Sequence, residues 1–323
     1  SSTGSMRIPS GSSAYRGNSG RGIFAGGWEP GSVRNIDFIN IASTGSATAW
    51  GEIITVGAAL AGGASNNIRG VIAGGYTGAP SAARISTIQA LTIPTNGEIF
   101  DFGDLQFNSQ QLSGVGNATR GVYANGYAYP NMSPVSSNSV NMSYTMIEFM
   151  SSANRTDFGD IIPGAASRDL ATCETPIRGY FAGGEGTDQS PTNNKKITIK
   201  GFANNSESLN FGELSTLSNR GAAVGSATRG VFIIGNTIPA YTNTMEYITL
   251  TTSGETTDFG DTTANTGSIN NAAASNTIRG VYHHPQTAGG GTILNTLEYI
   301  TIASTGNAID FGDLNYVSRD GCG

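Results

Sequence analysis

The chain has 323 residues and a net charge of −6; only 12% of its residues are charged, and 46 are glycine. Long runs of good helix formers are absent, so this composition excludes a helical protein and is typical of a turn-rich all-β protein. The negative charge disfavours nucleic acid as a partner, and no stretch approaches the roughly 20 apolar residues of a membrane-spanning helix, so we expect a soluble protein.

Taken in chain order, the first clear strand of each repeat begins with Arg-Gly, continues with two or three apolar residues and usually ends in Gly-Gly. This motif occurs six times, at intervals of 48, 51, 58, 51 and 50 residues. A period near fifty predicts a propeller blade, because four short strands and their turns take about that length. The repeated arginines are Arg21, Arg69, Arg120, Arg178, Arg229 and Arg279.

The next predicted strand alternates apolar and polar residues, as in IDFINI from Ile36 and LEYITI from Leu297. Alternation in a strand sends successive side chains to opposite faces of the sheet. In the third repeat the corresponding segment is MIEFMS from Met146, followed by a shorter turn. We expect one face to carry Phe38, Ala90, Ile199, Tyr247 and Tyr299, and the other to carry Asp37, Gln89, Thr198, Glu246 and Glu298.

A third landmark, DFGD or a close variant, follows the alternating strand in every repeat. Its aromatic residue predicts a ring of aromatic side chains that packs each sheet against the next. Between each DFGD and the next Arg-Gly, small residues such as those of 218–228 predict an innermost strand, where neighbouring blades crowd together. The aromatic residues are Trp50, Phe102, Phe158, Phe211, Phe259 and Phe311.

These landmarks predict one domain, 1–323, with an all-β fold: a six-bladed kelch-like β-propeller with four antiparallel strands per blade. The C-terminal SRDGCG matches the start of an innermost strand, and STGSM near the N-terminus matches a DFGDL place. One terminus should therefore overlap the other to close the ring, and the pattern leaves open which one. The blades are expected at about 13–53, 62–105, 112–161, 168–214, 219–262 and 270–314, with 13–20 as the first innermost strand.

The repeat resembles the kelch family and the propeller domain of galactose oxidase, whose blades carry an apolar strand ending in Gly-Gly, then an aromatic residue and a spaced tryptophan. Here the glycine pairs are Gly26-Gly27, Gly74-Gly75 and Gly183-Gly184, and the tryptophan place is mostly phenylalanine. The resemblance covers nearly the whole chain. The LEYITI-like strands, STGN turns and DFGDL closures look similar to kelch-like repeats of virion proteins from phages of marine bacteria.

The six repeated arginines allow two interpretations. They could form a cationic ring that grips an anionic polysaccharide through bidentate contacts, or each could pair with an acid of the DFGD turns, which recur with the same period. Residues repeated in every blade usually serve the blade, so we expect the structural pairing. The matching acids are Glu52, Asp104, Asp160, Glu213, Asp261 and Asp313.

The only histidines, His283 and His284, stand where other repeats have a glycine pair or a relic of one. Adjacent side chains in a strand point to opposite faces, so we expect a local surface or protein contact here and no shared metal. The resemblance to galactose oxidase would imply copper held by converging histidines and a cysteine–tyrosine crosslink. Neither Cys173 nor Cys322 stands in a matching context, and their places in the ring are too far apart for a disulfide.

We predict no catalytic residue, no cofactor and no metal. A glycosidase needs two carboxylates in a cleft, and most acids of this chain are fixed in the repeat. The acids that the repeat leaves over form no recognisable motif; they are Glu174, Glu185, Asp188 and Asp320.

The loops after the Gly-Gly landmark carry most of the aromatic and polar diversity, and loops at one end of a rigid scaffold are the usual place for recognition. Their aromatic residues could stack on sugar rings, insert into a partner protein, or cap their own blades. The candidate binding residues are Trp28, Tyr76, Tyr127, Tyr129, Glu185, His283 and His284.

The sequence thus predicts a protein that is not an enzyme: a structural or receptor-recognition component of a phage virion, such as a fibre, knob or decoration protein. It would be found in the virion or outside the cell, with other virion proteins or a cell-surface glycan as partners, and could oligomerise through that assembly. The alternative is a secreted, lectin-like carbohydrate-binding module, with a copper oxidase or glycosidase third.

Overall fold

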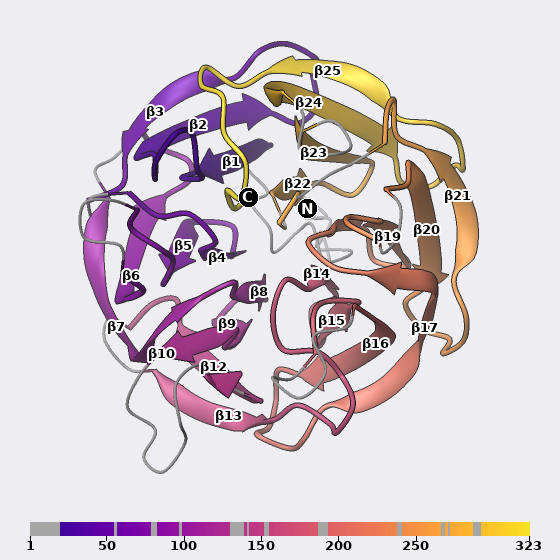
Figure 1. Ribbon diagram of the computed structural model, residues 1–323, viewed down its shortest axis with the longest axis horizontal. Helices are drawn as coiled ribbons and strands as arrows, with labels where there is room; N and C mark the ends of the chain where they lie inside the picture. The colour runs from indigo at the N-terminus through magenta and orange to yellow at the C-terminus, as the bar shows by residue number, and fades with distance from the viewer. Residues whose placement is uncertain are drawn as a thin grey trace, which may run out of the picture.

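A computed structural model describes residues 20–54, 57–78, 83–96, 99–129, 139–140, 142–151, 155–186, 193–237, 241–265, 269–270, 272–286 and 292–323. Figure 1 shows β-sheets arranged in a closed ring, each with one strand near the axis and one at the rim. There are six sheets, so the fold is the six-bladed β-propeller that the repeat predicts. Within the described ranges, no helix is long and apolar enough to cross a membrane.

The strands of each blade follow the landmarks of the repeat. The small-residue stretch forms the innermost strand, Arg-Gly begins the second, the alternating segment is the third and DFGD lies in the fourth. Paired strands within a blade are antiparallel. Blade one contains β1 (Arg21–Ala25), β2 (Asn35–Asn40) and β3 (Thr48–Glu52). Blade two contains β4 (Gly62–Ser65), β5 (Arg69–Ala73), β6 (Ile85–Thr92) and β7 (Phe100–Gln110). Blade three contains β8 (Ser113–Gly116), β9 (Arg120–Ala124), β12 (Ser143–Glu148) and β13 (Thr156–Asp160). Blade four contains β14 (Ala171–Glu174), β15 (Arg178–Ala182), β16 (Asn194–Gly201) and β17 (Leu209–Ser218); blade five β18 (Ala222–Gly225), β19 (Arg229–Ile233), β20 (Thr244–Thr249) and β21 (Thr257–Asp261); blade six β22 (Ala273–Ser275), β23 (Arg279–Gln286), β24 (Ile293–Thr301) and β25 (Ile309–Asp313).

Blade two carries an extension that reaches toward blade three. The strand β7 continues past its DFGD segment and pairs with β10 (Tyr127–Tyr129), which pairs in turn with β11 (Ser139–Val140). The sheet of blade two therefore has six strands. This pairing links the loop after the second strand of blade three to the blade before it.

The ring closes at blade one through the C-terminal segment. Blade one has three strands of its own, and its fourth place is taken by the end of the chain. Ala25 and Cys322 exchange backbone hydrogen bonds of 2.9 and 3.0 Å. Trp28 and Arg319 exchange two more, of 2.7 and 3.2 Å. The sequence allows either terminus to close the ring, and the C-terminal one lies beside β1. Of the predicted first innermost strand, 13–20, residues 13–19 fall outside the described residues.

The glycine after the repeated arginine allows a close approach of the preceding blade in blades one, four, five and six. A Cβ atom at Gly22 would lie 2.7 Å from the Cβ of Ala274, and one at Gly230 would lie 2.7 Å from the Sγ of Cys173. Both neighbours belong to the innermost strand of the preceding blade. Real Cβ atoms essentially never come this close. At such places a larger residue would push neighbouring blades apart, whereas a Cβ at Gly70 or Gly121 would meet only side chains of its own blade.

The phenylalanines of the DFGD segments lie in buried clusters that adjacent blades share, as Phe158 does with Phe202 of blade four and Phe259 with Ile300 of blade six. Phe259 lies 6.1 Å from Tyr247 and Phe311 lies 6.0 Å from Tyr299, ring centroid to ring centroid, in edge-to-face geometry. The phenylalanines at this place are buried, whereas Trp50 is partly exposed. The apolar face of each alternating strand thus packs on the fourth strand of its own blade.

The polar face of the alternating strand is buried too, because it binds the backbone of the preceding blade. Asp37 accepts a 2.7 Å hydrogen bond from the backbone N–H of Asn315, and Gln89 accepts one of 2.7 Å from that of Ile54. Each donor comes just after the fourth strand of the blade before. These repeated polar side chains therefore satisfy backbone groups between blades. The buried residues of this face include Asp37, Gln89, Thr198, Glu246 and Glu298.

The repeated arginines clamp each blade to the next. Arg229 Nη1 donates to the carbonyl oxygens of Ile302 and Ala303, at 3.1 and 2.9 Å, and the guanidinium lies 4.3 Å from the Tyr247 ring centroid. Arg178 departs from this pattern: the Tyr180 hydroxyl, which also binds Arg178, donates to the carbonyl of the next blade. The same clamp joins Arg21 to Ile93, Arg69 to Phe149, Arg120 to Phe202 and Arg279 to Ile41.

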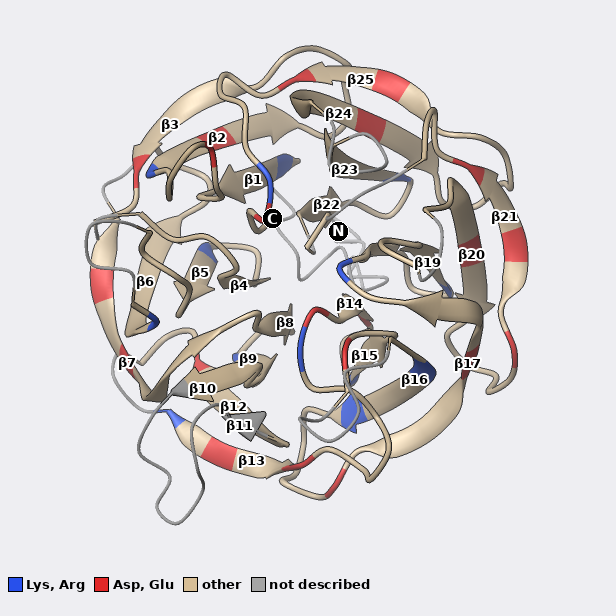
Figure 2. Ribbon diagram, viewed as in Figure 1, with Lys and Arg blue, Asp and Glu red and all other residues tan. Residues whose placement is uncertain are grey.

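The expected ion pairs between these arginines and the DFGD acids are wrong. Arg21 pairs in register with Asn40 and Glu52 pairs with Asn35, at opposite ends of β2, so the arginine and the acid lie a strand length apart. Figure 2 shows the acidic residues mostly along the rim strands. In the described part of the chain, acids at this place pair with other cations, such as Glu52 with Arg34 at 3.4 Å and Glu213 with Lys195 at 2.6 Å.

Candidate binding face around the axis

The two faces of the ring carry different elements. The turns before each Arg-Gly pair and the turns between third and fourth strands lie on one side, which we call the lower face. The loops after the second strands and the segments entering the innermost strands lie on the other side, the upper face. Residues at equivalent places of the upper face differ from blade to blade, which makes it the candidate binding face.

One residue per blade, seven positions after the repeated arginine, begins the loop of the upper face. Its backbone pairs with the segment that enters an innermost strand, as in the bridges of Tyr76 with Ala59 and of Asn236 with Asn219. We call these six residues the outer circle. Blades one to three carry aromatic residues there, and blades four to six carry polar ones. The outer circle is Trp28, Tyr76, Tyr127, Glu185, Asn236 and Gln286.

The sequence-predicted aromatic residues of blades one and two lie together. The Trp28 and Tyr76 ring centroids are 6.0 Å apart with planes tilted by 32°, and both side chains are partly exposed. The backbone of Tyr76 also bridges to Arg84, which brings that arginine to the edge of the pair. The result is a mixed aromatic and cationic surface over two blades.

This surface continues into blades three and four through Tyr127. The guanidinium carbons of Arg84 and Arg168 lie 4.4 and 4.8 Å from the Tyr127 ring centroid, within cation–π range. Arg168 also forms a 2.8 Å ion pair with the predicted Glu185, whose side chain is 20% exposed. Tyr129 ends β10, and its side chain lies outside what the structure describes.

A second circle of six residues surrounds the axis on the upper face, and the sequence pattern marks only Asp320 among them, as an acid that the repeat leaves over. Each has a left-handed backbone, with φ between 52° and 60°, although none is glycine. Their backbones bind one another from blade to blade: Gln111 N–H donates to Leu60 C=O at 2.7 Å, and Arg220 N–H donates to Asp169 C=O at 2.9 Å. Such strain persists only where the surrounding structure imposes it. This inner circle is Leu60, Gln111, Asp169, Arg220, Asn270 and Asp320.

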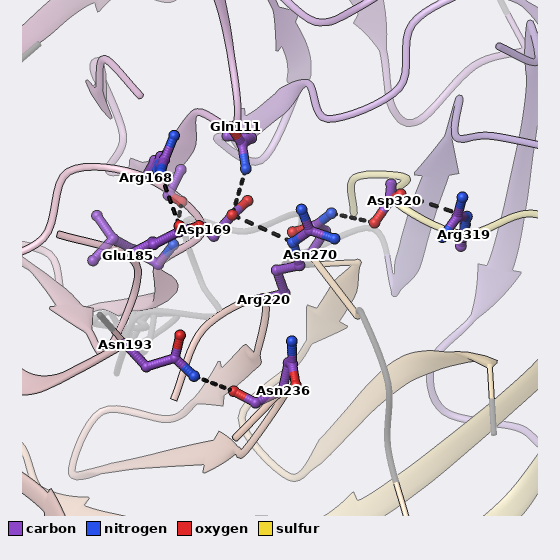
Figure 3. Close-up of polar contacts among 12 residues, drawn as sticks. Gln111, Arg168, Asp169, Glu185, Asn193, Arg220, Asn236, Asn270, Arg319 and Asp320 are labelled. Carbon is purple, nitrogen blue, oxygen red and sulfur yellow. Dashed lines mark hydrogen bonds and ion pairs between the residues drawn. The ribbon is translucent and has the colours of Figure 1, made fainter. Parts of the chain in front are cut away.

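The polar side chains of the inner circle lie among the contacts drawn in Figure 3, which also shows Arg168 with Glu185 and Asn193 with Asn236. Gln111 Nε2 donates to Asp169 Oδ2 at 2.5 Å, and Arg220 Nε lies 3.4 Å from the same oxygen. Further round, Asn270 Nδ2 donates to Asp320 Oδ1 at 2.5 Å. Five of the six positions are polar, and their side chains differ in charge, so the network has no rotational symmetry.

Asp169 is a buried carboxyl group of this network whose pKa is shifted by its surroundings. Burial raises its pKa to about 6, Arg220 opposes the rise and Asp320 adds to it. Its Oδ1 atom accepts no hydrogen bond among the described residues. A cavity of about 10 Å³, room for one water molecule, borders Asp169, Gln111 and Asn270. The inner circle therefore changes charge in the range between pH 5 and 7.

The expectation that His283 and His284 make surface contacts is wrong, because both are buried in β23. Without the glycine pair, β23 continues as a strand to Gln286 where other blades begin a loop. His283 Nε2 lies 3.1 Å from the Leu294 carbonyl, and burial lowers the pKa of His283 to about 4. His284 Nδ1 lies 2.9 Å from Glu298 Oε1. Both histidines are thus part of the interior of blade six.

Within the described ranges, no group of three or more His, Cys, Asp or Glu side chains is placed to hold a metal ion. Cys173 and Cys322 are free and buried. Burial raises the pKa of the Cys322 thiol to about 12. Cys322 therefore stays protonated and packs as a small apolar residue in the ring closure.

A scan against protein-family models finds no match, and a search of curated proteins finds no similar sequence. What this protein does is therefore inferred from its own residues.

Proposed function

We propose that this chain is a noncatalytic recognition protein whose upper face binds a partner. The observation that carries the proposal is the contrast between repeated and non-repeated polar residues. The repeated arginines and the polar face of the alternating strands are engaged between blades. At equivalent places of the upper face, in the outer and inner circles, the residues differ between blades. Loops that vary from blade to blade at one end of a rigid scaffold are the usual place for recognition.

The aromatic half of the outer circle supports a role in recognition. Trp28 and Tyr76 are partly exposed and contact each other, so they present one continuous apolar surface, next to the backbone bridge between Tyr76 and Arg84. Aromatic side chains next to polar groups are the usual anchors of sugar and protein ligands. Tyr127 already contacts two guanidinium groups, so its role here is to hold Arg84 and Arg168 in place.

Within this proposal, the leading assignment is a structural or receptor-recognition component of a phage virion, bound to other virion proteins or to a cell-surface glycan. The likeness of its repeat to kelch-like virion repeats supports it. Immunogold electron microscopy with antibodies against this chain tests it: intact particles should be labelled on their surface. Recovery of the chain only as free protein, with particles unlabelled, would reject the assignment.

The alternative, a secreted lectin-like module, is favoured by the Trp28–Tyr76 pair, whose rings suit stacking on a sugar. A glycan array with the isolated protein separates the two assignments. Specific binding that is lost in Trp28→Ala and kept in Asn236→Ala, a control in the polar half of the same circle, favours the lectin. No binding by the isolated protein favours the assembly component.

A further inference from the structure

Exposed apolar residues occur on every second blade of the lower face. Directly before the repeated arginine, blades two, four and six carry isoleucine with 51%, 65% and 65% of its surface exposed. Blades three and five carry exposed threonine at that place, and blade one carries Gly20. The isoleucines are Ile68, Ile177 and Ile278, and the threonines are Thr119 and Thr228.

A second place in the repeat alternates in the same phase. Directly before the DFGD-type motif, blades two, four and six carry a large apolar residue, 36%, 64% and 56% exposed. Blades one, three and five carry exposed threonine there. The apolar residues are Phe100, Leu209 and Ile309, and the threonines are Thr48, Thr156 and Thr257.

In each even-numbered blade the two apolar residues flank the repeated arginine. Arg69 pairs in register with Thr92 at the lower end of β6, and Phe100 pairs with Ala90 on the other side of the same strand. The Arg69 guanidinium accordingly lies 5.3 Å from the Phe100 ring centroid. We call each such group a lower patch. The three lower patches are Ile68, Arg69 and Phe100; Ile177, Arg178 and Leu209; and Ile278, Arg279 and Ile309.

The fold does not require this alternation. Threonine occupies both places in blades three and five, which have the same strands and the same arginine clamp. The apolar side chains are turned to solvent and not into the core. Met150, in a turn of blade three, is a further exposed apolar residue of this face that does not follow the alternation. The residues at these two exposed places repeat on every second blade, so they have three-fold and not six-fold symmetry. Because the fold does not require this lower symmetry, a binding partner is its natural explanation.

We propose that the lower face docks coaxially on a homotrimeric protein, each of whose three chains contacts one lower patch. Alternate blades of a six-bladed ring are related by a third of a turn, so a partner with a three-fold axis presents three equivalent contacts to them at once. Three modest contacts made together bind far more tightly than one. This attachment rests on the proposed assembly role, but not on what the upper face binds.

The charge of the lower patches specifies what each partner chain presents. Every patch has an arginine between two exposed apolar residues, and the clamp hydrogen bonds of Arg69 and Arg279 come from the Nη1 atom. The guanidinium retains donors that suit a carboxylate. The partner chain should therefore present an apolar side chain beside an acidic one. A second copy of this chain fits poorly, since two lower faces would bring arginine against arginine.

The test uses the tagged full chain as bait in its natural source, with native mass spectrometry of the purified complex. The substitutions Ile68→Thr, Ile177→Thr and Ile278→Thr are combined in one variant, because threonine already stands at this place in blades three and five. The matched control combines Ile54→Thr, Leu217→Thr and Val317→Thr, three exposed apolar residues outside the lower patches, 48%, 41% and 40% exposed. Thermal unfolding establishes that both variants fold.

We expect one copy of this chain with three copies of a single partner, at least about tenfold weaker binding in the lower-patch variant, and unchanged binding in the control. A different stoichiometry, equal binding by the lower-patch variant, or a dimer of the isolated chain that this variant abolishes would overturn the inference. Failure to recover any complex overturns it as well; immunogold labelling of particles then shows separately whether the proposed function stands.

Discussion

The upper and lower faces of the ring use the same repeat in different ways. On the lower face, the repeated arginine reaches a carbonyl oxygen of the next blade in five blades, and in blade four the Tyr180 hydroxyl takes its place. On the upper face, equivalent places hold Leu60, Asp169 and Arg220, among others, in one strained backbone conformation. Repetition thus supplies the bonds that hold blades together, and departures from repetition supply the chemistry of a surface.

Removal of the C-terminal closing segment should have the largest effect on stability, because this segment joins the two ends of an otherwise open array of blades. Deleting 318–323 removes the four backbone hydrogen bonds to Ala25 and Trp28, and also the 2.7 Å bond from Leu60 to Asp320 in the inner circle. The free energy of unfolding of a domain is only about 5–15 kcal/mol, so the loss of these bonds is a large part of it. We expect the truncated chain to lose its cooperative thermal transition in circular dichroism, while Cys322→Ala keeps it. An unchanged melting temperature after truncation would contradict this role of the C-terminus.

Substitution of a glycine where two blades approach closely should have the second-largest effect on stability. A Cβ at Gly280 would collide with the Val224 side chain of blade five, so Gly280→Val should destabilise the protein by about 3 kcal/mol or more. Gly51 has open space around its Cβ position and serves as the control; Gly51→Val should change stability by less than about 1 kcal/mol. Urea unfolding of both variants measures the difference, and equal midpoints would mean that the blades are not packed this tightly.

Loss of one arginine clamp on the lower face should have the third-largest effect on stability. Arg279→Gln loses the charged hydrogen bond to the Ile41 carbonyl and the contact with the Tyr299 ring, and should cost about 1.5–3 kcal/mol. Lys195→Gln, which breaks an exposed ion pair with Glu213, should leave the unfolding midpoint unchanged. If the two substitutions had the same effect, the clamp would be no more than a surface contact.

The smallest expected effect is on the pH dependence of stability, which should differ between a substitution in the inner circle and one in blade six. The pKa of Asp169 is raised to about 6, so its contribution to stability is present at low pH and is lost as pH rises from about 4 to about 6. The pKa of His283 is lowered to about 4, so its contribution is lost as pH falls from about 6.5 to 4. Relative to the native protein, Asp169→Asn should therefore lose more stability on acidification from pH 7 to 5, and His283→Gln should lose less, each by about 1–2 kcal/mol. Melting temperatures at the two pH values measure both, and shifts of the same sign would refute the assignment.

The sequence by itself determined the number of blades, the identity of their four strands and the aromatic residues packed within them. These features follow from period and alternation, which are local: one blade of fifty residues contains all the information, and six copies repeat it. The glycine after each arginine could be found in the same way, although the close approach of the preceding blade, which requires it in four of the blades, could not.

Only the tertiary structure decided which partner each repeated side chain takes. Arg279 binds the carbonyl of Ile41, 238 residues away, and the fourth-strand acids lie a strand length from any such arginine, so a matching period did not mean a contact. The burial of His283 depends on a strand that continues where other blades turn. The inner circle brings together residues about fifty positions apart whose types differ, because its geometry is set by the curvature of the closed ring and not by any local pattern.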